Sequence, residues 1–467
     1  MTAPNTSRTY HDVVVIGGGS AGYAAARTAR SAGADVAIVD QGPLGGLCIL
    51  RGCMPTKAIL RSAEVGSLIR RSQEFGFSTS DARADLPAIV DRKNRLVKEF
   101  ADYRIGQLHD PGFTLYQAKA AFRSPHEITV GDQVLSARSI VVATGSSPTL
   151  VPVPGLSEAG YLTSDGILDV REQPESLIVL GGGPVAVEFG QFFARLGTKV
   201  TLLQRSPTVL SQMDEDVGSA LEAALREEGV DIVSGVDFMR VTHKDGLKAV
   251  TVRQDGKERT FVGEDILQAL GRRPNISGLN LEAAGVRIEE GMICIDEAMR
   301  TSQPHIYAVG DVNDLTPIVH LAIQQGELAG YNATHPDGPL RKIEHRLDME
   351  VVFTDPQVAV VGVSERACRD EGTPYLRATY PFADHGKALC RGDLHGFVKL
   401  LADPSNGSLL GAHIVGPEAG ELIHELVAVM YFNGTAADLL RMPHYHPTLA
   451  EIITYPAESL VEQMGTR

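Results

Sequence analysis

The hydrophobic positions of this chain gather in short β-branched runs that are followed by glycines. Residues 12–16 form a continuous apolar run that is too short for a helix, which predicts a buried parallel strand. A glycine-rich turn over 17–22 leads into an alanine-rich stretch typical of a helix, and 35–40 predicts a second strand that ends in a carboxylate. This order predicts a dinucleotide-binding βαβ unit. The residues expected to contact the dinucleotide are Gly17, Gly19, Gly22 and Asp40.

The same pattern returns downstream, with a strand at 176–180, a glycine turn at 181–186, a helix to residue 196 and a strand at 199–203. Two further apolar strands end in polar turns, one at Thr144-Gly145 and one at Asp311, where open α/β sheets bind ligands. Two dinucleotide sites suit an enzyme that passes a hydride between a soluble nicotinamide and a bound flavin. The alternative is a single ligand with a second site that has lost its function.

The pattern changes near residue 342, where short alternating segments replace the glycine turns. Strands are expected at 351–353, 357–361, 397–401 and 409–415, followed by a helix at 421–432. Pro148, Pro152 and Pro154 suit a linker, which places a boundary near Leu150. We therefore expect an α/β protein with two Rossmann-like domains and a C-terminal α+β domain. The expected domains are 1–150 with 273–341, then 151–272, then 342–467.

Composition narrows the possible partners and location. A chain of 467 residues with 43% hydrophobic content exceeds the size of one core, which agrees with several domains. The net charge is −15 and no Lys/Arg-rich block interrupts it, which argues against nucleic-acid binding. Residues 1–11 are polar and no long uncharged apolar stretch follows, so neither export nor membrane insertion is indicated. The expected location is the cytoplasm.

Two cysteines, Cys48 and Cys53, stand just after the first βαβ unit with four residues between them. Five cysteines are too few for a disulfide-stapled secreted fold, and a close pair beside a nucleotide site indicates a catalytic pair that opens and closes as a disulfide. A thiol attacks as the thiolate, so the chemistry needs a base, and histidine is the residue type whose side chain titrates nearest to neutral pH. The other cysteines show no metal-ligand spacing, and no metal site is expected.

These motifs together resemble the FAD-dependent pyridine-nucleotide-disulfide oxidoreductases, the group that contains dihydrolipoamide dehydrogenase, glutathione reductase and mercuric reductase. The resemblance implies an FAD domain, an NAD(P) domain, a central segment and a C-terminal dimerisation domain, hence a homodimer. The matching stretches run from end to end of the chain, at 17–22, 45–57, 143–146, 181–188, 271–275, 301–311, 352–356 and 444–451.

The resemblance also implies a role for each site residue. Cys48 would attack the substrate sulfur, and Cys53 would lie against the flavin. Lys57 would lie by the flavin N5 and pair with Glu188, while His446, oriented by Glu451, would serve the cysteine pair of the other subunit. His444 is expected to be a packing residue. The further residues expected to bind the cofactors are Gly46, Ala120, Thr144, Gly145, Asp311, Gly181, Gly183, Gln204, Arg205 and Gly271, with Lys57 among them.

The chain departs from the family pattern at its second nucleotide site and between its cysteines. Gln204 stands where an NAD enzyme carries an acid, and Arg205 can meet a 2′-phosphate, so NADP(H) is preferred over NAD(H). The alternative is that Arg205 is a solvated surface charge. Pro184 replaces a tyrosine that shields the flavin. Arg51, between the cysteines, is expected to lower a thiol pKa or attract an anionic substrate, or else to form a surface salt bridge.

The substrate follows less directly from the sequence. His446 and Glu451 suit a small dithiol, a disulfide or a lipoyl-bearing protein, so a dihydrolipoamide dehydrogenase-like enzyme is favoured. An NADPH-dependent reductase of a small disulfide comes next, with a mercuric reductase-like enzyme, although residues 461–467 lack the cysteine pair that mercuric reductase usually adds there. An NAD(P)H-sensing interaction module is the alternative from another class. A flavin oxidase or transhydrogenase would need no cysteines.

Overall fold

The computed structural model describes residues 8–79, 83–313 and 315–465. Residues 1–7, part of the N-terminal segment interpreted above, lie outside the described residues, as do residues 466 and 467. Two compact units divide the chain. The first comprises Met1–Ala58, Asp91–Leu150 and Gly271–Glu344, and the second comprises Ile59–Val90, Val151–Leu270 and His345–Arg467.

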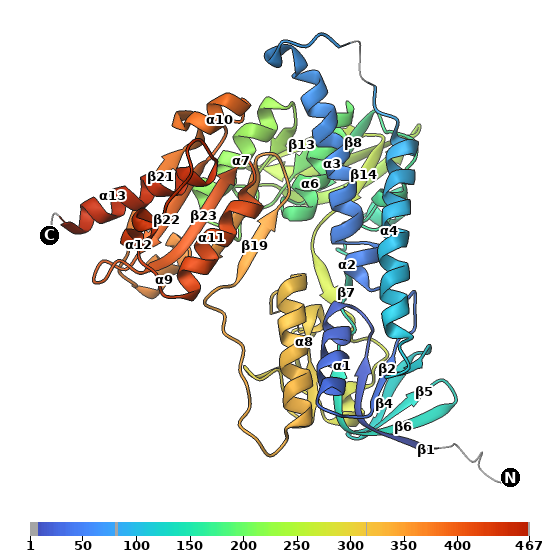
Figure 1. Ribbon diagram of the computed structural model, residues 1–467. Helices are drawn as coiled ribbons and strands as arrows, with labels where there is room; N and C mark the ends of the chain where they lie inside the picture. Colours follow the sequence, from blue (N-terminus) through green and yellow to red (C-terminus); the bar gives the residue numbers. More distant parts are fainter. Residues whose placement is uncertain (1–7, 80–82, 314, 466–467) are drawn as a thin grey trace. The chain divides into compact units, whose positions relative to one another are not determined.

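A seven-stranded sheet forms the centre of the first unit, and its strands are parallel except for the antiparallel β4 and β5 (Figure 1). Strand β1 (Arg8–Ile16) lies between β2 (Val36–Val39) and β6 (Gln133–Val142), and β18 (Ile306–Ala308) also pairs with β6. The parallel pairing confirms the first dinucleotide-binding unit as a Rossmann-like sheet. Strand β1 begins before residue 12 because Arg8 to His11 pair with Val134 to Ala137, a contact that local hydrophobicity does not reveal.

Helix α1 (Ser20–Ser31) packs directly against α8 (Val319–Thr334) in the same unit (Figure 1). Glycines make the close approach possible, because a Cβ on Gly326 would lie 2.2 Å from the carbonyl oxygen of Ala21. A Cβ on Gly330 would lie 2.4 Å from the carbonyl oxygen of Ala25. The backbone contact therefore fixes α1, and with it the glycine turn that opens the helix.

The second unit contains another parallel sheet, in the order β10 (Asp231–Val233), β9 (Lys199–Leu203), β8 (Ser176–Leu180) and β14 (Asp265–Gln268). Strands β8 and β9 have the bounds expected from the sequence. Helix α6 (Pro184–Leu196) follows β8, and α7 (Glu215–Glu227) follows β9. An antiparallel sheet of β11 (Asp237–Lys244), β12 (Leu247–Gln254) and β13 (Lys257–Gly263) was not expected, because its strands are largely polar.

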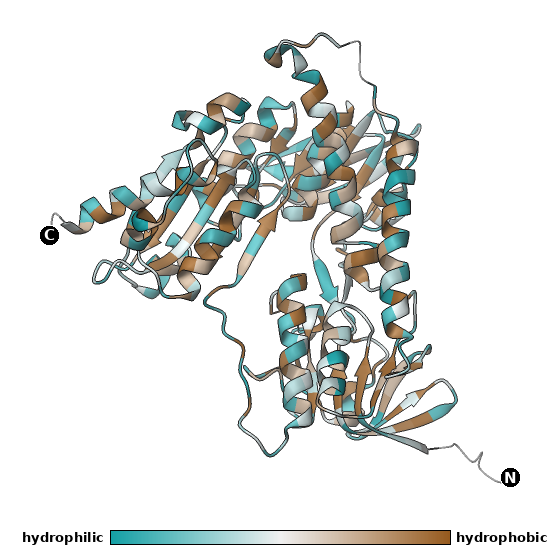
Figure 2. Cartoon of the chain, viewed as in Figure 1, coloured by the Kyte–Doolittle hydropathy of each residue, from teal (hydrophilic) through white to brown (hydrophobic). Residues whose placement is uncertain are grey.

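The C-terminal part of the second unit is an antiparallel sheet with helices, which confirms the expected α+β domain. Its strand order is β19 (Met349–Val352), β20 (Gln357–Gly362), β23 (Leu409–Gly416), β22 (Phe397–Ala402) and β21 (Leu376–Pro381). Helix α11 (Ala419–Tyr431) packs on β20 and β23, and α13 (Thr454–Gly465) packs on β21. The central strands β22 and β23 carry mostly hydrophobic, buried side chains (Figure 2).

Further helices and strands complete the fold. The remaining helices are α2 (Leu47–Leu50), α3 (Cys53–Arg70), α4 (Leu86–Leu108), α5 (Leu156–Ala159), α9 (Glu365–Glu371), α10 (Gly386–Arg391) and α12 (Ala436–Arg441). The remaining strands are β3 (Thr114–Tyr116), β4 (Ala120–Ser124), β5 (Glu127–Val130), β7 (Ser146–Pro148), β15 (Arg272–Pro274), β16 (Ile288–Glu289) and β17 (Met292–Ile293). Among the described residues, no helix combines the length and apolarity needed to span a membrane.

Candidate redox and dinucleotide-binding sites

The glycine turn after β1 leaves its helix N-terminus clear of side chains. Gly17 has φ +107°, and a Cβ on Gly22 would lie 1.8 Å from the carbonyl oxygen of Gly17, so both positions require glycine. The loop before the cysteines comes close to this turn, because a Cβ on Gly46 would lie 2.7 Å from the Cα of Gly19. The free N–H groups and positive dipole end of α1 fit the diphosphate of a dinucleotide.

Asp40 holds the turn at the end of β2. Its Oδ2 accepts a hydrogen bond from the backbone N–H of Gly18 at 2.7 Å, and its Oδ1 accepts one from Gly42 at 2.7 Å. A carboxylate oxygen has more than one lone pair, so Asp40 can still accept a hydrogen bond from a ribose hydroxyl. The structure thus places Asp40 with Gly17, Gly19 and Gly22 in one cradle.

A polar network lies where β6 and β18 end. Asp311 Oδ2 accepts a hydrogen bond from Ser146 Oγ at 2.6 Å, and Ser146 Oγ accepts one from Arg272 Nε at 2.8 Å. Thr144 Oγ1 donates to the carbonyl oxygen of Asn275 at 2.7 Å. Arg272 and Asn275 lie in a stretch that matches the family but were not singled out, because their partners are more than a hundred residues away in the sequence.

Other expected cofactor residues lie around this network. Gly145 has φ +70°, and Gly271, with φ +106°, accepts a hydrogen bond through its carbonyl oxygen from the backbone N–H of Thr149 at 2.9 Å. Ala120 opens the edge strand β4, where it pairs with Val130. Thr144, Gly145, Gly271 and Asp311 are therefore brought together, and Ala120 lies on a separate strand of the same sheet.

Cys48 and Cys53 are present as thiols, and the side chain of Cys48 is hydrogen-bonded to that of Cys53. Cys48 lies in α2, and Cys53 is the first residue of α3, where the helix dipole favours a thiolate. The hydrogen bond with Cys53 and then burial raise the pKa of Cys48, while the backbone of Cys53 and the charge of Lys57 oppose this rise. The Cys48 thiol therefore needs a base that removes its proton before it can react as a thiolate.

Lys57 and Glu188 belong to different units. Lys57 lies on α3, one turn after Cys53, and its positive charge favours the thiolate of Cys48. Glu188 lies on α6, is buried, and accepts a hydrogen bond at Oε1 from the backbone N–H of Phe353 at 2.8 Å. Their expected pairing stays a prediction.

The second glycine turn repeats the geometry of the first. Gly181 has φ +114°, and a Cβ there would lie 2.5 Å from the carbonyl oxygen of Ala269. Gly183 caps α6, Pro184 is the first helical residue, and Ala186 is fully buried in place of a third glycine. The N-terminus of α6 therefore also fits a diphosphate.

Gln204 and Arg205 differ in how far each side chain is exposed to solvent. Gln204 is 5% exposed, and its Nε2 donates to the carbonyl oxygens of Ser206, at 3.0 Å, and Thr208. Its Oε1 lies against Gly182, because a Cβ there would be 2.1 Å away. Arg205 is exposed and forms no ion pair with the described part of the chain. Gln204 thus orders the loop, and Arg205 is the group available to a ligand.

His446 and Glu451 form the expected dyad. His446 Nδ1 lies 3.0 Å from both carboxylate oxygens of Glu451, and the histidine side chain is 75% exposed. The carboxylate therefore fixes the ring and leaves Nε2 facing outward. His444 differs, because it is 8% exposed and held by Glu425 at 2.7 Å and by the carbonyl oxygen of Met442 at 3.0 Å.

The sequence did not reveal a second histidine behind this dyad. His385 Nε2 lies 4.0 Å from Glu451 Oε2, and the side chain is buried against Tyr455. Burial lowers the pKa of His385, which keeps the ring neutral. No local sequence pattern marks His385, because the residues it contacts, Glu451 and Tyr455, lie far along the chain.

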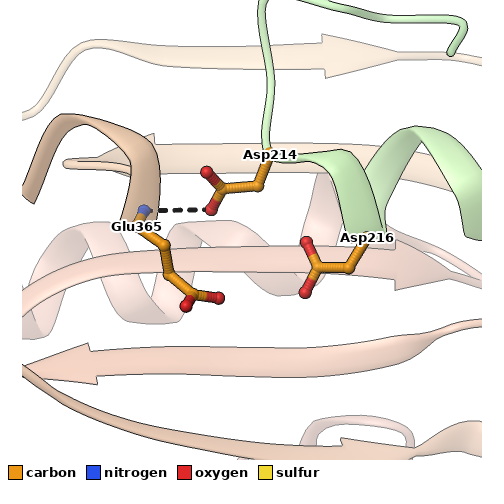
Figure 3. A group of neighbouring side chains, drawn as sticks. All are labelled: Asp214, Asp216 and Glu365. Atoms are coloured by element: carbon orange, nitrogen blue, oxygen red, sulfur yellow. Dashed lines mark hydrogen bonds between the residues drawn. The ribbon is translucent and has the colours of Figure 1, made fainter. Parts of the chain in front are cut away.

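Three carboxylates gather between α7 and α9 (Figure 3). Asp214, Asp216 and Glu365 bring oxygen atoms within 4.8 Å of one another, and the backbone N–H of Glu365 donates to Asp214 Oδ2 at 3.0 Å. Lys399 Nζ donates to all three, at 2.8 Å to Asp214, 2.8 Å to Asp216 and 3.0 Å to Glu365. The ammonium group supplies the positive charge, so the cluster is an ion-pair network.

Comparison with known proteins agrees with this geometry. Residues 11–326 match the family described as pyridine nucleotide-disulphide oxidoreductase, and residues 349–457 match its dimerisation domain, which supports a homodimer. Mercuric reductase of Staphylococcus aureus is 34% identical over 94% of this chain and 81% of its own length. Dihydrolipoyl dehydrogenase of Mycobacterium tuberculosis (strain ATCC 25618 / H37Rv) is 34% identical over 98% and 99%.

A solved structure is also similar over the whole chain. It is described as the Cu(II) complex of the HOCl-induced flavoprotein disulfide reductase RclA from Escherichia coli. The TM-score is 0.85 at 27% identity, covering 97% of this chain and 99% of that one. The two glycine turns, the thiol pair and these matches agree, and the cofactors of such enzymes are FAD and a pyridine nucleotide. The chain therefore belongs to the pyridine nucleotide-disulphide oxidoreductase family.

Proposed function

We propose that this protein passes electrons between NAD(P)(H), FAD, the Cys48–Cys53 pair and a dithiol or disulfide, with a dihydrolipoamide-like dithiol as its first candidate substrate. The observation that carries the proposal is the hydrogen-bonded thiol pair at the N-terminus of α3, with Lys57 one turn away. Two sulfurs in contact can form a disulfide and open again. The similar dihydrolipoyl dehydrogenases, matched over nearly their whole length, support the substrate.

The side chains of this chain have distinct tasks in disulfide reduction. The Cys48 thiolate attacks a substrate sulfur and one substrate thiol leaves; Cys53 then attacks Cys48, and the second thiol leaves as the Cys48–Cys53 disulfide closes. His446 removes a proton from Cys48 and returns it to the leaving sulfur. Bound FAD supplies two-electron chemistry with the nicotinamide. The sum is NAD(P)H, a proton and one disulfide giving NAD(P)⁺ and two thiols.

The dyad is proposed to serve the other subunit of the homodimer. His446 is 75% exposed although Glu451 fixes its Nδ1, so the ring is accessible to a thiol of the other subunit. The match of residues 349–457 to a dimerisation domain supports this arrangement. The active site would then be completed only in the dimer.

NADP(H) is proposed as the preferred nicotinamide. The support comes from Arg205, which is exposed beside the second glycine turn, and from Gln204, which places no carboxylate where a 2′-phosphate would lie. A guanidinium binds phosphate through charge-assisted hydrogen bonds.

Anaerobic titration of the FAD-loaded enzyme with dihydrolipoamide tests the proposal. We expect a long-wavelength charge-transfer absorption and reduction of NAD(P)⁺, and the Cys48→Ser variant should lose turnover while it retains FAD. Neither absorption nor turnover with dihydrolipoamide or with a panel of small disulfides would contradict the proposal. Full activity in Cys48→Ser would indicate a flavin oxidase or transhydrogenase instead.

Reduction of a thiophilic metal ion is the second candidate. It is favoured by the 34% identity to mercuric reductase of Staphylococcus aureus and by the similarity to the Cu(II) complex of RclA. Here the paired thiolates would bind the ion, and two electrons from NAD(P)H would convert Hg(II) to Hg(0). Adding Hg(II) or Cu(II) to the same assay compares the candidates, and metal-dependent NADPH oxidation that exceeds disulfide turnover would favour the metal ion.

A further inference from the structure

His385 is a buried histidine whose ring forms no hydrogen bond. The residue is 1% exposed, and within the described residues neither Nδ1 nor Nε2 has a hydrogen-bond partner. His444, in the same unit, differs because both of its ring nitrogens have partners, the carbonyl oxygen of Met442 and the carboxylate of Glu425. A buried polar group without a partner disfavours folding, so its presence calls for a reason other than stability.

One ring nitrogen of His385 faces the carboxylate of the dyad. Nε2 lies 4.0 Å from Oε2 of Glu451, and both oxygens of Glu451 lie 3.0 Å from Nδ1 of His446. In the part of the chain that the structure describes, these two histidines are the polar side chains within ion-pair distance of that carboxylate. His446 is exposed and His385 is buried, so the carboxylate lies between a solvent-facing ring and an interior ring.

Packing fixes the ring of His385. The residue is the N-cap of α10, and its backbone N–H donates to the carbonyl oxygen of Phe382 at 3.0 Å. The ring of Tyr455 meets the imidazole edge to face, with centroids 6.1 Å apart, and Tyr455 stacks on Tyr380 at 4.2 Å. Tyr455 follows Glu451 by four residues, so one short segment supplies both the carboxylate and the aromatic wall.

The protonation state of His385 suits a hydrogen-bond donor. Burial lowers its pKa, with the charge of His446 acting in the same direction and that of Glu451 opposing it. The ring is therefore neutral near neutral pH and carries one N–H. An ionised carboxylate only accepts, so that proton belongs on Nε2, on the side of Glu451. The separation of 4.0 Å is longer than a hydrogen bond, and the hydrogen bonds of catalytic groups often tighten only in the substrate complex.

We propose that His385 is a positioning residue for the base, because its Nε2–H holds the Glu451 carboxylate in place while His446 takes up and returns the proton of Cys48. The inference rests on the proposed function and adds a residue to the control of its base. Protonated His446 is supported only as long as the carboxylate keeps its orientation towards Nδ1. A donor on the buried side of Glu451 supplies that constraint, so His385 acts on the reaction through Glu451.

A double-mutant cycle tests this inference. We would measure kcat and KM of the FAD-loaded enzyme with lipoamide, or with the best disulfide of the panel above. His385→Leu should lower kcat by about five-fold or more with little change in KM, but by less than about two-fold in the Glu451→Gln background. His385→Phe keeps a ring against Tyr455 without a donor and should behave like His385→Leu. His385→Gln places an amide N–H near the position of Nε2 and should restore part of kcat.

The flavin half-reaction separates a positioning role from a structural one. FAD content and the rate of flavin reduction by NADPH should be unchanged in the His385 variants, because neither depends on the base. The control is His395→Leu, since His395 is a partly exposed histidine 3.4 Å from the carboxylate of Glu227 and should not affect kcat.

Three results would overturn the inference while leaving the proposed function intact: full kcat in His385→Leu, an equal loss in both backgrounds, or loss of FAD from His385→Leu and His385→Phe. The last two would assign His385 to the fold. A wild-type enzyme that reduces no disulfide, although NADPH reduces its flavin, would overturn the proposed function and this inference with it. A loss of kcat that disappears in Glu451→Gln supports both.

Discussion

Lys399 donates a hydrogen bond from Nζ to Asp214 Oδ2 at 2.8 Å, and the lysine side chain is fully buried. Lys399 lies on β22 of the C-terminal sheet, whereas Asp214 precedes α7 of the second nucleotide-binding segment. Burial alone would raise the pKa of Asp214, but the hydrogen bond from Lys399 and the backbone N–H of Glu365 lower it to about 2. This buried ion pair therefore links the C-terminal sheet to the segment before α7 within the second unit.

Replacing the lysine should destabilise the fold strongly. In Lys399→Met, Asp214, Asp216 and Glu365 would lose their shared cation, and breaking a buried pair typically costs about 3 to 5 kcal/mol. Urea unfolding of the FAD-loaded protein measures the loss. The matched control is Lys342→Met, because Lys342 forms an exposed ion pair with Glu297 at 2.8 Å and should matter little. Similar midpoints for the two variants would contradict the prediction.

His413 should make the protein sensitive to mild acid. Burial, followed by the charge of Lys399, lowers the pKa of His413 from 6.5 to about 4. A histidine whose pKa is lower in the folded than in the unfolded state contributes its full stabilisation above the unfolded-state pKa of 6.5. This contribution, about 3 kcal/mol, is lost as the pH falls from 6.5 towards 4.

Unfolding free energies measured at pH 7 and pH 4.5 test this prediction. The fall between the two values should be smaller in His413→Asn than in the wild type. The exposed His424 supplies the control variant His424→Asn, which should behave like the wild type. An equal pH dependence in all three proteins would show that His413 does not titrate as expected.

Glu451 should control the base more than the fold. Glu451→Gln keeps the shape of the side chain but removes the charge that orients and supports protonated His446, which lies 3.0 Å away. We expect kcat to fall by about 10- to 100-fold. Glu425→Gln, next to the neighbouring His444, is the matched control and should leave kcat nearly unchanged.

Arg205 should set the choice of nicotinamide. Arg205→Ala is expected to lower kcat/KM for NADPH by about ten-fold or more and to leave that for NADH nearly unchanged, because only NADPH carries the 2′-phosphate. Arg240 is an exposed arginine of β11 that pairs with Glu258 at 3.3 Å, so Arg240→Ala is a suitable control. An unchanged ratio of the two efficiencies would refute the assignment.

Gly46 should be required for flavin retention. An alanine there would place its Cβ 2.7 Å from the Cα of Gly19, in addition to the strain of φ +79°. Gly76→Ala separates these effects, since Gly76 has φ +80° but no heavy atom within 4 Å of its added Cβ. We expect Gly46→Ala to lose FAD, measured by absorbance at 450 nm, and Gly76→Ala to retain it. Equal FAD content would argue against the cradle.

Local patterns predicted the parallel strands but not the long-range polar contacts. Strands β8 and β9 have the expected bounds because each is a buried apolar run that ends at a glycine turn or a polar loop. The polar strands β11 to β13 escaped prediction, since hydrophobic periodicity is weak on exposed hairpins. His385 and Lys399 also escaped, because their importance comes from burial and from partners distant in the sequence. The Cys48–Cys53 pair was recognisable because only four residues separate the two cysteines in the chain.

The buried contact of Lys399 also limits how this protein can be recombined with its relatives. A chimera that takes residues after 345 from another family member would supply a new residue at position 399 and keep Asp214 and Asp216. Without a lysine in the incoming sheet, the carboxylates would repel one another inside the hybrid. Exchange of the C-terminal domain should therefore succeed only when the hybrid contains both the acidic residues at the start of α7 and the lysine of β22.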